Sequence, residues 1–136
     1  MIILDTSVWI EYLRQNEPIA NQVSTLLAEQ KVIAVEPVFA ELMFGVRNAQ
    51  ERSVVKTFWQ ILPRADMGDE SLFSTSDLAF QYDYQSKGIG LIDALIIRTA
   101  QAGNHKLWTL DERIISILDN VQLFYVSDIE NIEDIQ

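Results

Sequence analysis

The sequence predicts an α/β protein: a three-layer α/β/α domain with a central, mainly parallel sheet of four or five strands. Short, continuously apolar runs alternate with segments of helical periodicity, a pattern typical of buried parallel strands joined by helices. The 136 residues contain no repeat and no linker rich in Gly, Ser or Pro, so residues 1–136 are expected to form a single domain. The carboxyl ends of parallel strands share one sheet edge, where open α/β sheets bind their ligands.

The predicted strands are short and apolar. The first run covers residues 2–4 and ends directly at Asp5. The second covers residues 32–35, and the third covers residues 106–110 and ends at Asp111. A run over residues 121–126 is expected to form a fourth strand or an edge strand.

The helices between these runs are bounded by residues that favour helix ends. Thr6 and Ser7 can cap a helix over residues 8–13, and Pro18 fits the first turn of the next helix. The remaining helices are expected to begin at Pro37 and to cover residues 50–62, 69–85, 91–102 and 112–118. The acidic tail, residues 127–136, has isoleucines at helical spacing and predicts a short amphipathic helix.

Composition excludes several classes of function. The chain has no cysteine, which rules out disulfides, thiolate metal sites and a cysteine nucleophile, and its single histidine rules out sites with several imidazoles. No apolar run approaches the ~18 residues that span a bilayer, and the first residues lack the basic start of a signal peptide, so a cytoplasmic location is expected. The formal charge of −10 and the pI of about 4.4 argue against a broad basic face for nucleic acid.

Four carboxylates stand out by their positions. Asp5 and Asp111 each follow an apolar strand directly, whereas Glu41 and Asp93 lie near the starts of helices and within apolar segments. All four can therefore converge on the carboxyl edge of the sheet. A carboxylate placed in an apolar segment is costly to bury unless another group compensates its charge.

Each of these acids also has a purely structural explanation. Asp5 and Asp111 could cap the helices that follow them, and Asp93 could be a first-turn acid favoured by the helix dipole. Glu41 lies too far into its helix to cap it, but it could pair with Arg47 or Arg98. All of these explanations would have to hold together, and a shared pocket is the simpler hypothesis.

A shared acidic pocket has an energetic consequence. Two carboxylates about 5 Å apart repel by about 3 kcal/mol at an effective dielectric of about 20, so four of them would protonate, separate or hold a cation. Oxygen ligands without cysteine or paired histidines select a hard cation, Mg²⁺ or Mn²⁺. Such a site suits water attack on a phosphodiester.

Four segments together resemble the PIN-domain ribonucleases, and in particular the VapC-type toxins of type II toxin–antitoxin pairs. The resemblance covers nearly the whole chain, with each segment in order and carrying one of the acids. The segments are IILDTSVWIEYL, VIAVEPVFAELMFGV, GIGLIDALIIRTAQAGNHKL and LWTLDERI.

The resemblance implies roles for individual residues. Asp5, Glu41, Asp93 and Asp111 match the acidic quartet that binds one or two Mg²⁺ or Mn²⁺ ions, with Asp5 and Asp93 as the most direct ligands. Thr6 matches a hydroxyl that orients the first acid or a water, and Ser7 and Thr109 are weaker candidates for this role.

The resemblance also implies an activity and partners. The metal would activate a water for attack on an RNA phosphodiester, leaving a 5′-phosphate and a 3′-hydroxyl. Family members are commonly homodimers, and a small antitoxin protein fills the acidic cleft and inhibits them.

Two other functions stay open at this point. A catalytically degenerate domain of this fold could act only as a binding module. An aspartate-dependent phosphatase would use Asp5 as nucleophile, but that chemistry usually needs a second Asp two residues on, where this chain has Ser7. Several basic residues are candidates to line the cleft, without a signal that favours any of them: Lys31, Arg47, Lys87, Arg98 and Lys106.

Overall fold

The computed structural model describes residues 1–68, 71–119 and 122–125. At its centre lies a parallel sheet in the order β2-β1-β3, formed by Val32–Ile33, Ile2–Leu4 and Lys106–Trp108. In this register Ile3 pairs with Ile33 on one side and with Leu107 on the other. All three carboxyl ends point the same way, and the predicted α/β class is confirmed.

The described residues contain three strands rather than the four or five that were predicted. Within the described residues 122–125 of the predicted fourth strand, the pairing is a single parallel bridge between Leu107 and Leu123. The second strand ends earlier than predicted. Ala34 forms a bridge with Arg64, far along the sequence, instead of pairing with the first strand, and a helix begins at Glu36. The sheet is therefore small and is enclosed mainly by helices.

Seven helices lie within the described residues, close to their predicted positions. The first helix begins at Thr6, because Asp5, and not Thr6 or Ser7, occupies its N-cap position. The predicted helix over residues 69–85 is shorter, and the predicted tail helix lies outside the described residues. The helices are α1 (Thr6–Leu13), α2 (Ile19–Ala28), α3 (Glu36–Phe44), α4 (Ala49–Ile61), α5 (Ser71–Gln81), α6 (Leu91–Ala102) and α7 (Glu112–Ile117).

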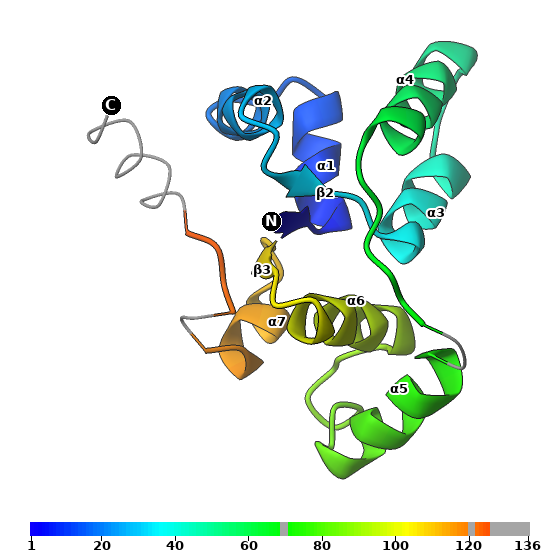
Figure 1. Cartoon of the computed structure of the whole chain (residues 1–136), viewed down its shortest axis with the longest axis vertical. Coiled ribbons are helices and arrows are strands. Elements are labelled where there is room, and N and C mark those ends of the chain that lie inside the picture. The colour runs from blue at the N-terminus through cyan, green and yellow to red at the C-terminus, as the bar shows by residue number, and fades with distance from the viewer. Residues whose placement is uncertain (69–70, 120–121, 126–136) are drawn as a thin grey trace.

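The helices surround the strands and bury them. Figure 1 shows α1 to α4 in the upper half of the view and α5 to α7 in the lower half, with the strands between them. The core includes Ile3, Leu4, Trp9 and Ile96, each almost fully removed from solvent. None of the helices in the described ranges has the length and apolar character needed to cross a membrane.

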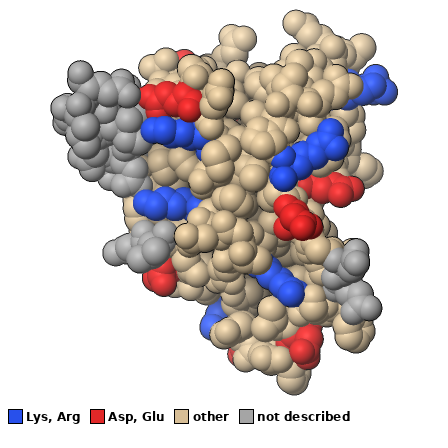
Figure 2. Space-filling model, in the orientation of Figure 1, with Lys and Arg blue, Asp and Glu red and all other residues tan. Residues whose placement is uncertain are grey.

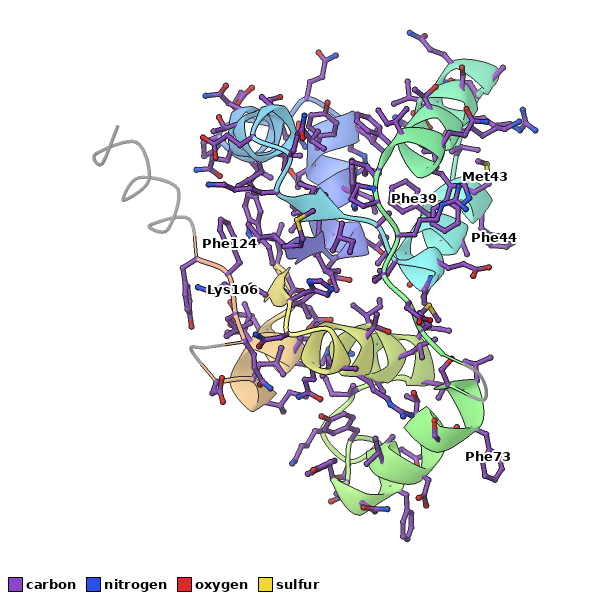
Figure 3. All side chains as sticks on the ribbon, in the orientation of Figure 1. Phe39, Met43, Phe44, Phe73, Lys106 and Phe124 are labelled. Atoms are coloured by element: carbon purple, nitrogen blue, oxygen red, sulfur yellow. The ribbon has the colours of Figure 1, made fainter. Side chains whose placement is uncertain are left out.

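Several large aromatic side chains remain outside this core, among them Phe44, Phe73 and Phe80. Phe44 at the end of α3 is 95% exposed and Phe73 on α5 is 82% exposed, and both point away from the body of the molecule (Figure 3). Phe39, five residues before Phe44, instead packs on Trp9 with ring centroids 5.3 Å apart. The apolar content of α3 is thus divided between the core and an outward-facing end.

Candidate functional site

Asp5 occupies the centre of the carboxyl edge, because β1 is the middle strand of the sheet. Its carboxylate is buried and accepts three hydrogen bonds. The backbone N–H of Thr6 donates to Oδ1 at 2.8 Å, and the hydroxyls of Ser7 and Thr109 donate to Oδ2 at 3.2 and 2.7 Å. These donors hold a buried charge in one orientation without any cationic partner.

Thr109 links this carboxylate to the segment after β3. Its buried hydroxyl also accepts a hydrogen bond from the backbone N–H of Asp111 at 3.1 Å. The Ser7 hydroxyl makes a parallel link, since it accepts from the N–H of Leu110 at 3.2 Å. Two hydroxyls therefore join the first and third strands at the point where both end.

Glu41 and Asp93 face the same region from two different helices. Burial and the charges of Asp5 and Asp93 raise the pKa of Glu41 above its ordinary value. Burial, followed by the charges of Asp5 and Asp111, raises the pKa of Asp93, and a hydrogen bond from the Gly90 backbone partly offsets this. Each acid thus interacts unfavourably with its neighbours, as expected for like charges that share one pocket.

The local sequence explains how these two acids are presented. Asp93 is the third residue of α6 and Gly90 is its N-cap, so the Asp93 carboxylate is well placed to accept from the Gly90 N–H. Glu41 lies in the middle of α3, and it forms no ion pair with any described residue. Arg47 pairs instead with Glu51, and Arg98 bonds to Ser74. The alternative that Glu41 is half of a structural ion pair with Arg47 or Arg98 is therefore wrong.

Asp111 behaves differently from the other three acids. It caps α7 by accepting from the Arg113 backbone N–H at 2.9 Å, as the structural explanation predicted. The Arg113 side chain also binds both of its oxygens, with Nε at 3.1 Å from Oδ1 and Nη2 at 2.8 Å from Oδ2. The guanidinium holds the pKa of Asp111 below its usual value.

Thr6 lies beside Glu41, next to a small hollow. Its hydroxyl oxygen is buried and makes no hydrogen bond of normal geometry, but it lies near enough to the Glu41 carboxylate to lower the pKa of that group. A cavity of about 100 Å³ adjoins both side chains and also reaches Arg14 and Arg47. A buried hydroxyl without a partner marks a position where water or a polar ligand would be bound.

The donor set fits a hard divalent cation. Asp5, Glu41 and Asp93 offer carboxylate oxygens, form no ion pair within the described part of the chain, and repel one another through their charges. Their side chains do not form a finished coordination shell, since no three His, Cys, Asp or Glu groups among the described residues lie close enough to hold an ion. The acids lie within electrostatic reach of one another, and a cation bound between them would relieve their mutual repulsion.

Most of the predicted site residues meet at this edge. Asp5, Glu41 and Asp93 act electrostatically on one another, and Asp111 acts on Asp93. Arg113 was missed, because a Lys or Arg in a short helix is most often a solvated surface charge. The spacing of Asp111 and Arg113, two residues apart at a helix start, is the signal that could have identified it.

The fold and the pocket define a parallel α/β protein with a carboxylate-lined site at the carboxyl edge of its sheet. The PIN domain family model matches residues 2–119, and the chain belongs to the PIN-domain family. PIN domains are generally nucleases, and they generally use divalent metals such as Mg²⁺. The predicted family is therefore confirmed. Comparison with curated proteins gave no significant match.

Solved structures with the same fold include three protein complexes. VapBC2 from Rickettsia felis, bound to a DNA fragment from its promoter, is 24% identical with a TM-score of 0.68, over 91% of this chain and 98% of that one. VapBC-1 from nontypeable Haemophilus influenzae is 25% identical with a TM-score of 0.67, over 93% and 99% of the two chains. FitAcB from Neisseria gonorrhoeae is 23% identical with a TM-score of 0.64, over the same fractions.

Proposed function

We propose that the chain is a Mg²⁺- or Mn²⁺-dependent endoribonuclease and the toxin of a toxin–antitoxin pair. The observation that carries this proposal is the electrostatic coupling of Asp5, Glu41 and Asp93, in a chain that belongs to the PIN-domain family. The charge of Asp5 raises the pKa of both Glu41 and Asp93, and none of the three acids forms an ion pair with a described residue, an arrangement that suits a divalent ion. The structural likeness to VapBC complexes supports the toxin assignment.

In this proposal the four acids have different roles in binding the cation. Asp5 and Asp93 would hold the cation directly, and Glu41 and Asp111 would complete the site. The bound cation would supply Lewis-acid chemistry, activating water and neutralising the phosphodiester. Ser7 and Thr109 keep the Asp5 carboxylate in one orientation. The unpartnered Thr6 hydroxyl would orient a water next to Glu41, whose raised pKa suits it to accept a proton.

The partners follow from the charge and shape of the surface. An acidic pocket favours a basic peptide, which fits an antitoxin segment that carries arginine. A homodimer is proposed because members of the family that this chain resembles are commonly homodimers, and the exposed Phe44 and Phe73 are candidate contacts in it. We expect the whole chain, residues 1–136, to act as a single PIN domain in the cytoplasm.

The test is cleavage of single-stranded RNA by the purified protein. With Mg²⁺ we expect products that carry a 5′-phosphate and a 3′-hydroxyl, and EDTA should abolish the reaction. Asp5→Asn should lower the rate at least about 100-fold, the loss typical of removing one preorganised electrostatic contact. The matched control is Asp77→Asn, which removes an exposed acid on α5 that accepts a hydrogen bond from Gln81.

Three outcomes would contradict the proposal. Full cleavage by the Asp5 variant would reject the role of the pocket. Cleavage that survives EDTA would reject the metal. Turnover of a small phosphomonoester, without cleavage of RNA, would favour the aspartate-phosphatase alternative.

A further inference from the structure

Arg113 is held rigidly at the rim of the acidic pocket by groups from two separate segments. Nε and Nη2 donate to the two oxygens of Asp111, and Nη1 donates to the Gly88 carbonyl oxygen at 3.0 Å. The bond to Gly88 spans 25 positions of sequence and ties the start of α7 to the segment that precedes α6.

The backbone at Gly88 is shaped to receive this arginine. Gly88 has a φ of +77°, which favours glycine. A Cβ placed there would lie 3.2 Å from Cδ of Arg113. Glycine therefore satisfies two requirements at this position, the left-handed backbone and the close passage of the arginine side chain.

The guanidinium still has donors to offer. It carries five N–H groups, and three are used by Asp111 and Gly88, which leaves two without a partner in the described part of the chain. The Arg113 side chain is 58% exposed, so these donors are accessible to a ligand. Its charge lowers the pKa of Asp93, so the cation lies within electrostatic reach of the pocket.

We infer that Arg113 binds a phosphodiester oxygen of the RNA beside the acidic pocket. This inference rests on the proposed function and adds a substrate-binding residue to it. The planar guanidinium matches phosphate geometry, and a guanidinium already fixed by Asp111 loses little conformational entropy when it binds. Asp111 then acts in part through Arg113, as the anchor that aims its free N–H groups.

The pocket needs such a cation for electrostatic reasons. A phosphodiester that approaches Asp5, Glu41 and Asp93 meets three negative charges, and a divalent ion alone does not balance them. Figure 2 shows basic and acidic side chains interspersed on the face in view, with no broad basic patch to attract RNA. A single arginine at the rim would supply local attraction where the substrate must bind.

The test measures binding of a fluorescein-labelled, single-stranded RNA by anisotropy over a range of KCl concentrations. Ca²⁺ replaces Mg²⁺ so that the RNA stays intact, which gel electrophoresis checks. Arg113→Ala should weaken binding about tenfold, the equivalent of one charge-assisted hydrogen bond. The slope of log K against log[KCl] should fall in magnitude by about 0.7, the value for one contact to a single-stranded phosphate.

Two further variants separate the contributions. Arg113→Lys keeps the positive charge but loses the planar guanidinium and its paired N–H donors. Its salt slope should therefore equal that of the wild type, whereas its affinity for RNA should stay below that of the wild type. The matched control is Arg52→Ala, which removes an exposed arginine on α4 outside the site and should change neither quantity.

The result that overturns the inference is an Arg113→Ala protein that binds RNA with unchanged affinity and salt slope. A variant that is merely less stable but binds normally when folded would overturn it as well, since Arg113 would then have a structural role only. Failure of the proposed function gives a different pattern. RNA would then bind in an Arg113-dependent way, but the wild type would not cleave it with Mg²⁺.

Discussion

Replacing Asp93 by asparagine should make the metal-free protein more stable while removing its activity. Asp93 is half-buried, and its charge is opposed by burial and by the charges of Asp5 and Asp111. Two like charges about 6 Å apart repel by about 3 kcal/mol at an effective dielectric of about 20. Solvent around a half-buried group screens this to about 1 kcal/mol. The side-chain oxygen of asparagine can still accept a hydrogen bond from the Gly90 N–H at the start of α6, so the substitution should cost little helix stability.

The assay is thermal unfolding in EDTA at pH 7, compared with the same measurement in excess Mg²⁺. In EDTA, a gain of about 1 kcal/mol should raise the melting temperature of Asp93→Asn by about 4 °C. Mg²⁺ should raise the melting temperature of the wild type more than that of the variant, because binding to the folded state stabilises it. The control is Asp77→Asn, an exposed acid outside the pocket. A variant that melts below the wild type in EDTA would refute the reasoning, since the acids would then not oppose one another.

Three further predictions concern the residues around the pocket. The pKa of Glu41 is raised above 4.5, so its ionisation lowers stability as pH rises through that window, and Glu41→Gln should stabilise the metal-free protein at pH 7 but not at pH 4. Chemical unfolding should show that Gly88→Ala lowers the free energy of unfolding by about 1–2 kcal/mol. The control is Gly68→Ala, because Gly68 has a similar φ of +69° but open space around its Cβ. An equal loss in the control would show that the contact with Arg113 adds nothing. Thr109→Val should cost about 1–3 kcal/mol, since it leaves one Asp5 oxygen and the Asp111 N–H without that partner. The control Thr99→Val, which loses only a bond to Leu95 within α6, should cost less in the same unfolding titration.

The order of the elements was predictable because the signals are local. The apolar run at residues 2–4 predicted the bounds of the first strand, and the glycine after Ala102 predicted the end of a helix. Both bounds agree with the structure. The short second strand was not predictable, since it depends on Ala34 meeting Arg64, a pairing between distant segments. The cap of the first helix was misplaced by one residue, because Asp5, Thr6 and Ser7 are all good capping residues.

In the site, too, the positions of residues were predictable from local sequence, whereas contacts between residues far apart in the sequence were not. Strand ends and helix starts predicted that Asp5, Glu41 and Asp93 lie near one sheet edge, because parallel topology brings those positions together, and in the structure Asp5 raises the pKa of both other acids. The hydroxyl network was not predictable in detail, since Thr109 and Asp5 are 104 positions apart. Nor could the sequence show that Arg113 turns back onto Asp111 and reaches Gly88, which depends on a side-chain conformation and on one positive φ.

The strong negative charge of the chain is compatible with an RNA substrate because much of it is concentrated. Without the four pocket acids the formal charge of −10 becomes −6, and four acids of the C-terminal tail account for most of the remainder. Those are Asp128, Glu130, Glu133 and Asp134. The rest of the surface is nearly balanced, so it neither attracts nor strongly repels a nucleic acid. Affinity for RNA would then depend on the pocket, where a divalent ion offsets part of the negative charge, and on an arginine held at its rim. A protein of this kind would bind RNA weakly without metal, and the acids that make its pocket unstable when empty would be the same ones that make it selective for the ion.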